Sequence, residues 1–298
     1  MSTVLVTGAS GYIGGRLATR LAAEKRPDMG ELRLMMRRPK AAHAPPGAKV
    51  VAGDAVSGEG LAQALDGVDV AYYLIHSMGR GGDRGFEQRD RAAATAFGRA
   101  AREARVRRLV YLGGLSSENS SAHLRSREEV AELLGAAGPR LTHVRAAMVI
   151  GAGSASFQML RALVARLPAM VCPRWIDTRT QPIAIDDVVG ALAALRDRDD
   201  VAGDVQLGGP EPLSYRAMME QAAAAMGRRP PAIVRVPVLT PRLSSYWVTL
   251  VTPVEAGLVR PLVDGLREEM VVTAPPPPGV NDDPQDFGTA VRAALAGR

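Results

Sequence analysis

Three glycines stand at a spacing that suits the binding of a phosphate group. Gly8, Gly11 and Gly14 follow an apolar, β-branched segment from Thr3 to Val6 and open a stretch with helical spacing of apolar residues. The first glycine permits a tight turn, the second lets the backbone approach a phosphate, and Gly14 or Gly15 allows the helix to pack closely on a sheet. Unsatisfied N–H groups at the helix start then bind the anion. The segment therefore predicts a site for a dinucleotide pyrophosphate, with contacts from Gly8, Ser10, Gly11, Tyr12 and Ile13.

Two arginines follow the second apolar segment, Leu32 to Met36. A site specific for NAD usually has an acid here, about 20 residues beyond the glycines, which accepts a hydrogen bond from the ribose 2′-hydroxyl. Arg37 and Arg38 offer cations for a 2′-phosphate instead, which favours NADP(H) over NAD(H). The alternative is a pair of solvated arginines in an arginine-rich chain. Asp54, with Ala55, is expected beside the adenine ring, in a short turn after the third strand.

Short apolar segments alternate with longer helical patterns along the first half of the chain. This alternation is typical of a parallel sheet with crossover helices. We therefore predict an α/β protein with a doubly wound parallel sheet, a Rossmann fold. Further strands are expected at Val50 to Val51, Val70 to Leu74, Arg108 to Leu112 and Leu141 to Arg145, and helices near residues 59–66, 86–104 and 126–137.

The second half of the chain has a less regular pattern. Pro182 to Ile185 is predicted as a strand, and Asp204 to Leu207 as the last strand. Asp186 and Asp187 are expected to be the N-cap of an apolar helix over residues 188–195. These elements are expected to return the chain to the sheet.

The predicted elements divide the chain into two parts. Residues 1–150, with 178–210 returning to the same sheet, are expected to form a dinucleotide-binding core. Residues 151–177 and 211–298 are expected to form a smaller substrate lobe over the cofactor site. The proline run at 275–278 predicts an end of regular structure, followed by a loosely attached tail with one weak helix.

Composition narrows the class of protein and its location. The 298 residues are 47% hydrophobic and 23% charged, which is typical of a soluble globular protein. The apolar stretch 241–266 is interrupted by Pro253, Glu255 and Pro261, so we expect it to roof a substrate pocket, with membrane contact as the alternative. No signal peptide is evident, and Cys172 is the only cysteine, so we expect a cytoplasmic protein.

The charge pattern narrows the class of partner. The net charge of +6 comes almost entirely from arginines spread along the chain, and aromatic residues are only 4% of it. Nucleic-acid binding is therefore not expected, because stacking platforms are few. The four histidines have no metal-ligand spacing, so no metal is expected. A small molecule is the expected partner, and the sequence does not predict an oligomeric state.

Several longer motifs carry a family resemblance. They are TGASGYIGG (7–15), VAGDA (51–55), YYLIHSM (72–78), VRRLVYLGG (106–114), QPIAIDDVVGAL (181–192) and LGGPEPLSY (207–215), with Arg145 at the end of the sixth strand. Together they resemble the atypical and extended short-chain dehydrogenase/reductases, especially the NmrA-like branch of NAD(P)H-binding proteins. The resemblance implies a seven-stranded doubly wound sheet with the cofactor across its carboxyl edge. There we expect further cofactor contacts from Leu74, Ile75, His76, Gly113 and Arg127.

The chain departs from this family at the catalytic helix. Short-chain dehydrogenases use a Tyr-x-x-x-Lys pair, in which the tyrosine transfers a proton and the lysine lowers the tyrosine pKa and holds the ribose. In SSAHLRSREEV (120–130), His123 takes the place of the tyrosine and Arg127 that of the lysine, while Gly113 and Gly114 replace the usual serine of the fifth strand. The expected catalytic groups are therefore His123, Arg127 and His76, with Tyr73 and Ser116 as other candidate proton donors.

Three functions fit these residues. The first is an NADPH-dependent reductase in which His123 or a nearby group protonates the substrate. The second is a non-catalytic NADPH-binding or redox-sensing protein. The third is a nucleotide-sugar epimerase or dehydratase, which is disfavoured because those reactions depend on the missing tyrosine and lysine.

Substrate contacts are expected from residues near the predicted carboxyl edge of the sheet and from the smaller lobe. Each has an alternative interpretation: Tyr72 and Tyr73 point to opposite faces of one strand, Ser154 suits a helix cap, and Trp175 suits local packing. The candidates are Tyr73, Ser116, Ser154, Phe157, Trp175 and Trp247.

Overall fold

The computed structural model describes residues 2–24, 28–39, 44–76, 85–116, 121–236, 252–254, 263–266 and 268–297. A seven-stranded sheet has the strand order β11-β6-β5-β4-β1-β2-β3, and every neighbouring pair is parallel. Its strands are β1 (Ser2–Thr7), β2 (Met29–Met36), β3 (Lys49–Ala52), β4 (Val70–Tyr73), β5 (Arg108–Gly114), β6 (Arg140–Ala146) and β11 (Gly203–Leu207). The order reverses between β1 and β4, which opens a crevice at the carboxyl ends of these strands. The predicted doubly wound sheet is confirmed.

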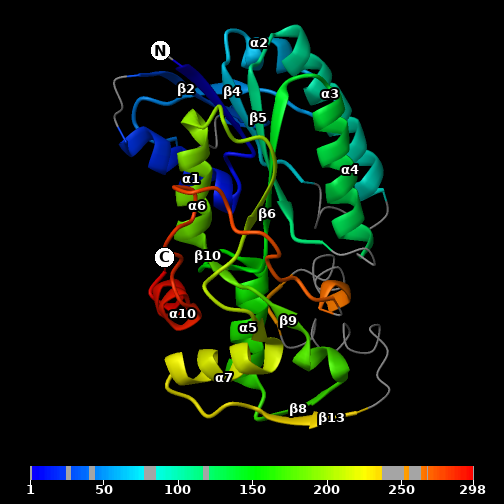
Figure 1. The fold of residues 1–298 in the computed structure, drawn as a ribbon, viewed down its shortest axis with the longest axis vertical. Coiled ribbons are helices and arrows are strands. Elements are labelled where there is room, and N and C mark those ends of the chain that lie inside the picture. The colour runs from blue at the N-terminus through cyan, green and yellow to red at the C-terminus, as the bar shows by residue number, and fades with distance from the viewer. Residues whose placement is uncertain are drawn as a thin grey trace.

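Helices cover both faces of this sheet (Figure 1). On one face lie α1 (Tyr12–Ala23) and α6 (Ile185–Ala194), and on the other lie α2 (Leu61–Leu65), α3 (Phe86–Glu103) and α4 (Ala122–Ala136). Side chains alternate along each strand, so Val4 and Val6 pack in the α1–α6 core while Leu5 packs in the α2–α4 core. Because both faces are buried, the central strands β1 and β4 are mostly apolar.

A lower lobe continues the molecule beyond the carboxyl edge of the sheet (Figure 1). Its helices include α5 (Ala155–Arg166), α7 (Tyr215–Ala225), α10 (Phe287–Leu295) and the short η2 (Arg174–Asp177). The short helix η3 (Leu195–Asp197) follows α6, and its Leu195 packs in the α1–α6 core. Three two-stranded sheets pair β7 (Val149–Ile150) with β10 (Ile183–Ala184), β9 (Arg179–Thr180) with β12 (Leu213–Ser214), and β8 (Ala169–Cys172) with β13 (Ala232–Arg235). Residues of α5, α7 and α10 share one hydrophobic core.

Three expectations for the second half need correction. Of Pro182 to Ile185, only Ile183–Ala184 is a strand, and it pairs with β7 outside the main sheet. Asp186 and Asp187 lie in the first turn of α6, whose N-cap is Ala184. Of residues 178–210, only β11 therefore joins the main sheet; the division into core and lobe stays a prediction.

The C-terminal segment is also packed more firmly than expected. Phe287 and Val291 of α10 are buried in the core that α10 shares with α5 and α7. Before this helix, Asp187 accepts hydrogen bonds from the backbone N–H (2.8 Å) and the side-chain amide (3.1 Å) of Gln285. The expectation of a loosely attached tail is wrong, because the proline run only separates the helix from the preceding chain and does not stop it from docking.

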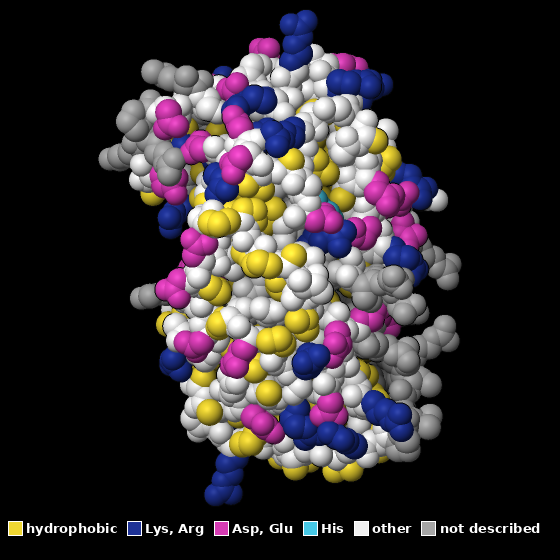
Figure 2. Space-filling model, viewed as in Figure 1, with side chains coloured by type: hydrophobic (Ala, Val, Ile, Leu, Met, Phe, Trp, Pro, Cys, Tyr) yellow, Lys and Arg dark blue, Asp and Glu magenta, His cyan; other side chains and the backbone are white. Residues whose placement is uncertain are grey.

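Charged side chains of both signs are mixed over the face seen in Figure 2. Among the described residues, no helix is long and apolar enough to cross a membrane.

Candidate cofactor and substrate site

The turn after β1 is built on a left-handed glycine. Gly8 has φ +65°, and a Cβ atom there would lie 2.5 Å from the carbonyl oxygen of Leu74, at the end of β4. Thr7 fixes the same two strands, because its hydroxyl donates to the carbonyl of Tyr72 (3.0 Å) and accepts from the N–H of Leu74 (3.1 Å). Gly11 closes the turn by donating its N–H to the Gly8 carbonyl (2.8 Å). Only glycine fits at position 8 without moving β4.

The start of α1 presents donors to an anion. Gly11 is the N-cap and supplies no side-chain cap, and a helical hydrogen bond runs from the Gly15 N–H to the Gly11 carbonyl (2.9 Å). The N–H groups of Tyr12, Ile13 and Gly14 precede this bond, so they lie in the part of the helix that lacks intrahelical acceptors. This glycine cradle fits the pyrophosphate of a dinucleotide.

Of the two candidate packing glycines, Gly14 makes the close approach. A Cβ atom on Gly14 would lie 2.4 Å from the Gly8 carbonyl oxygen, whereas one on Gly15 would lie 3.3 Å from the Ala9 carbonyl oxygen. The requirement for glycine is therefore at position 14.

The ring of Tyr12 joins this turn to the lower lobe. A Cβ atom on Gly153 would lie 2.4 Å from the ring, and one on Gly151 would lie 2.3 Å from its hydroxyl. The guanidinium of Arg16 stands 5.1 Å from the ring centre. Tyr12 is therefore placed to contribute its backbone to the cofactor site, while its side chain packs on the turn before α5.

The expected adenosine contacts lie at the ends of β2 and β3. Met36 pairs with Ala52 in adjacent strands, which brings Arg37, Arg38 and Asp54 to one edge. Both arginine side chains are exposed, and no ion pair of theirs occurs in the described part of the chain. Asp54 accepts from the N–H of Val56 (2.8 Å), which stabilises its turn. Ala55 is buried in the core, and this leaves only its backbone for a ligand.

A cavity of about 450 Å³ extends from the glycine turn into the lower lobe. Its wall includes the carboxyl ends of β5 and β6, the residues after β4, and parts of α4, α5 and α7. The size is that of an ordinary small-molecule site. It brings together eleven of the expected site residues: Gly8, Gly11, Tyr12, Ile13, Leu74, His76, Gly113, His123, Arg127, Ser154 and Trp175. Ser10 is exposed in the turn outside this wall, and Ile75 packs against the α2–α4 core.

His76 follows β4, and His123 and Arg127 lie on α4, yet the three side chains meet in the cavity wall. His76 is exposed to the cavity, yet protein surrounds it, and burial followed by the charge of Arg127 lowers its pKa to about 3. Burial, then Arg127, then His76 lower the pKa of His123 to about 3. Both imidazoles are therefore neutral near pH 7. His123 as the proton donor stays a prediction, and in its neutral form the ring offers an N–H hydrogen bond.

Arg127 is the charged centre of this cluster. Its Nη1 lies 3.5 Å from the carbonyl oxygen of Leu112, which is a long contact. Burial raises the pKa of the adjacent Tyr111 to about 12, although Arg127 pulls it down. Tyr111 therefore stays protonated.

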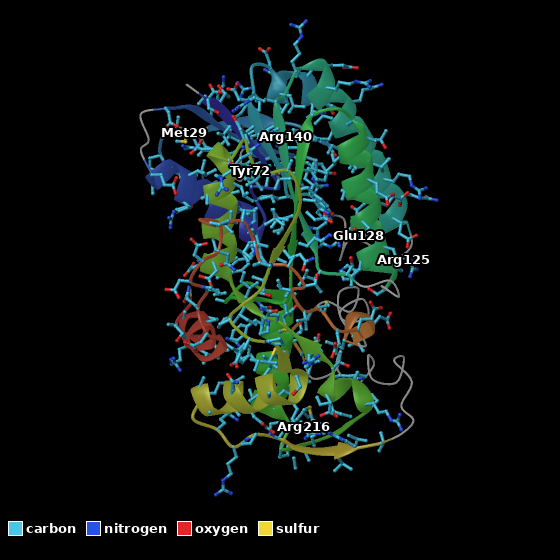
Figure 3. The ribbon with its side chains drawn as sticks, viewed as in Figure 1. Met29, Tyr72, Arg125, Glu128, Arg140 and Arg216 are labelled. Carbon is cyan, nitrogen blue, oxygen red and sulfur yellow. The ribbon has the colours of Figure 1, made fainter. Side chains whose placement is uncertain are left out.

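A polar network holds the helix that carries Arg127. Glu128 accepts from the hydroxyl of Ser116 (2.7 Å) and from Arg145 on β6 (2.5 Å), and Figure 3 shows Glu128 on the side of α4 nearer the sheet. Arg145 is also 3.3 Å from Asp204 on the neighbouring β11. The hydroxyl of Ser116 is thus hydrogen-bonded to α4. Ser116 does not line the cavity, so its expected role as a substrate contact needs correction.

Gly113 shows why a serine is missing at the end of β5. A Cβ atom there would lie 2.5 Å from Nε2 of His143, whose ring stacks on Tyr111 with centroids 5.2 Å apart. The other ring nitrogen of His143 is 3.0 Å from Asp204. The buried imidazole occupies the space that a serine side chain would need.

Two other expected substrate contacts are core residues. Tyr73 is 1% exposed between Phe97 and Tyr111, and Phe157 is 1% exposed in the lower core. Tyr72 faces the opposite side, where its hydroxyl donates to the Leu192 carbonyl (2.8 Å). Neither tyrosine of β4 reaches the cavity, because helices cover both faces of that strand.

The remaining expected contacts divide between capping and lining. Ser154 lines the cavity, but its hydroxyl donates to the Val149 carbonyl (2.7 Å) and caps α5. Trp175 lines the cavity with its ring edge-on to Tyr215, the centroids 6.2 Å apart. Trp247 lies outside the described residues. Of the expected roof 241–266, Val263, Gly265 and Leu266 are in the cavity wall.

Several lining residues have no counterpart in the sequence predictions. Ala146 to Val149 follow β6 and were detectable by the rule that ligands bind at the carboxyl ends of strands. The methionines and Tyr215 had no such signal, because an apolar residue on an amphipathic helix is typically core. Among those missed are Leu112, Gly114, Met148, Met159, Tyr215 and Met219.

Comparison with known proteins agrees with this geometry. Residues 8–150 match the model of a family described as NAD(P)H-binding. These residues, just under half of the chain, are similar to that family. The chain is also 29% identical over 236 residues, 76% of its length and 74% of the relative's, to the (4-alkanoyl-5-oxo-2,5-dihydrofuran-3-yl)methyl phosphate reductase of Streptomyces griseus subsp. griseus. The expected relationship to NAD(P)H-binding proteins is confirmed, and the NmrA-like branch stays a prediction.

Solved structures share the fold over nearly the whole chain. The triphenylmethane reductase of Citrobacter sp., complexed with NADP(H), has a TM-score of 0.76 at 19% identity, covering 98% of this chain and 100% of that one. A nucleoside-diphosphate-sugar epimerase from Staphylococcus aureus has a TM-score of 0.75 at 18% identity, with the same coverage. At these identities the likeness shows the fold alone.

Proposed function

We propose that this protein is an NADPH-dependent reductase of a small molecule, with a non-standard active site. One observation carries the proposal: His76, His123 and Arg127 meet in a cavity that begins at the glycine turn and continues into the lower lobe. A polarising cluster beside a cofactor cradle, with room beyond it, is the arrangement that hydride transfer to a bound molecule needs.

The cofactor contacts follow from the turn and the sheet edge. Backbone N–H groups at the start of α1 would hold the pyrophosphate, and Arg37 and Arg38 would contact the 2′-phosphate, which favours NADPH. When bound, the dihydronicotinamide supplies a hydride.

A cytoplasmic location also stays a prediction.

The residues of the cavity have distinct proposed roles. Arg127 stabilises the negative charge that develops on the substrate oxygen, because its charge is permanent and close to both imidazoles. His123 and His76 are neutral and orient that oxygen through N–H hydrogen bonds. The proton that completes the reduction comes from water. Glu128 and Arg145 position α4 and do not touch the substrate.

A second candidate is a non-catalytic NADPH-binding protein. The observation that favours it is the lowered pKa of both cavity histidines, which leaves them uncharged and unable to act as strong acids near pH 7.

A single-turnover assay separates these candidates. Purified protein is mixed with NADPH and a panel of ketones and enones, and loss of dihydronicotinamide absorbance is followed. We expect Arg127→Gln and His123→Asn each to lower the rate by about 10²- to 10³-fold. Arg125→Gln is the matched control, because Arg125 is exposed on the same helix and lies outside the cavity wall.

The outcomes are distinct. Equal rates in the wild type and in the Arg127 and His123 variants would refute the proposed site. If no compound oxidises NADPH above background although NADPH binds, the non-catalytic candidate replaces the reductase.

A further inference from the structure

The far half of the cavity is an apolar chamber. We define it by six residues of the lower lobe, Met159, Leu163, Trp175, Tyr215, Met219 and Leu266. All six belong to the hydrophobic core of that lobe, and none is more than 8% exposed. The chamber wall is therefore the lobe's own core, and a ligand there would extend that core.

Thioethers surround the chamber on several sides. Met159 lies on α5 and Met219 on α7, while Met148 follows β6 and Met270 precedes the proline run. Methionine is flexible and polarisable, and its sulfur contacts aromatic rings favourably. The rings of Trp175 and Tyr215 cross at 84° and add an aromatic surface. This wall suits a flat or alicyclic hydrocarbon body.

The charges of the cavity lie at its other end. Among the described lining residues, Arg127 alone carries a charged side chain, since His76 and His123 are neutral. In the chamber, burial raises the pKa of Tyr215, so its phenol stays protonated. No carboxylate or cation of the described lining faces the chamber, so a charged ligand group placed there would lack a counter-ion among these residues.

We propose that the substrate is a neutral, largely apolar molecule with a conjugated carbonyl group at one end. This inference rests on the proposed reductase function. The carbonyl oxygen meets Arg127 and the two imidazoles, and the hydrocarbon body fills the apolar chamber. A hydride from NADPH and a proton from water then add across the carbonyl or the conjugated double bond, and NADPH is oxidised to NADP⁺.

The same charges exclude other classes. A nucleotide sugar would place phosphates or hydroxyls among methionines, and a cationic dye would meet Arg127 without a compensating carboxylate in the described lining. Similarity of fold therefore does not by itself assign such a substrate to this chamber.

Binding of matched naphthalene probes tests the proposal without turnover. The naphthalene probes are 2-acetylnaphthalene, 2-naphthoate and (2-naphthylmethyl)trimethylammonium, and UDP-glucose is added as a nucleotide sugar. The affinity of each is measured by equilibrium dialysis with and without NADPH. We expect the neutral ketone to bind at least about tenfold more tightly than either charged naphthalene. Arg127 would repel the trimethylammonium group, and the carboxylate, with Arg127 as its one charged partner in the described lining, loses more solvation than the carbonyl does. UDP-glucose should not bind measurably.

Two variants localise the binding to the chamber. Met219→Ala should weaken ketone binding by about tenfold and leave NADPH binding unchanged, because it removes contact area. Met226→Ala is the control at the end of the same helix, outside the cavity wall. Ser156→Lys adds a cation at the half-buried edge of the cavity. This change removes no buried apolar side chain, so it should not prevent folding. It should shift the binding preference towards 2-naphthoate.

The results separate the two proposals. Ketone binding that depends on Met219, without NADPH oxidation, supports the substrate class and counts against the reductase. Equal or tighter binding of a charged probe, or no naphthalene binding at all, overturns the substrate class even if another compound is reduced.

Discussion

Gly14 faces the carbonyl oxygen of Gly8 so closely that a Cβ atom would approach it to 2.4 Å. The contact joins the first turn of α1 to the turn that follows β1. Since both partners are backbone atoms, the clash cannot be relieved by a side-chain rotation. The position of α1 on the sheet, and with it the N–H cradle, depends on this glycine.

We therefore expect Gly14→Ala to lower NADPH affinity by tenfold or more, on the order of 1.4 kcal/mol. Gly15→Ala is the control, because its Cβ would lie 3.3 Å from the Ala9 carbonyl oxygen, which is farther than the 2.4 Å at position 14. Alanine also favours a helix. Fluorescence titration with NADPH and thermal unfolding measure both variants. Equal affinities of the two variants would contradict the assigned role of Gly14.

The arginines after β2 should decide the cofactor preference. Replacing Arg37 and Arg38 by alanine removes charge-assisted bonds worth about 1.5 to 3 kcal/mol each, so NADPH affinity should fall at least about tenfold while NADH affinity stays within about twofold. Arg140→Ala is the control, because this exposed arginine begins β6 and so lies at the amino ends of the parallel strands, whereas Arg37 and Arg38 follow the carboxyl end of β2. Wild-type protein that binds NADH as tightly as NADPH would refute the preference.

Acidification should destabilise the protein through its cavity histidines. The pKa values of His76 and His123 are about 3 in the folded state and about 6.5 when unfolded. The unfolded state therefore binds protons first, and stability present above about pH 6.5 is lost as pH falls towards 3. His143, whose pKa burial also lowers, contributes in the same direction.

Thermal unfolding between pH 7.5 and 5 checks this sign. The Tm of the wild type should fall more steeply with acidification than that of the His76→Asn, His123→Asn double variant, which retains His143. Parallel slopes would show that protonation of these two imidazoles does not destabilise the folded state.

The C-terminal helix should be essential for stability. Phe287 is 4% exposed in the lower core, so Phe287→Ala should cost about 3–5 kcal/mol in free energy of unfolding. Arg292→Ala on the exposed side of α10 should cost less than about 1 kcal/mol. Urea unfolding measures both, and a loosely attached helix would give two small and similar values.

Local patterns in the sequence determined the nucleotide-binding turn, the seven strands of the main sheet and the positions of His123 and Arg127 on one helix. Glycine spacing and the two hydrophobic periods act over a few residues, so these features are readable without the rest of the chain. The sequence also identified Gly113 as the replacement for a serine, but not the reason for it.

Only the tertiary structure decided which residues meet. His143 lies 30 positions from Gly113, and its ring fills the space beside that glycine. Tyr73 points into a core rather than the cavity because α3 covers its face, and α10 docks beyond a proline run because α5 and α7 leave it an apolar surface. Met159 and Met219 have the spacing of ordinary core residues, yet the gap between their helices makes them the wall of a chamber. Burial is a property of the assembled surfaces, and no single segment contains both sides of a contact.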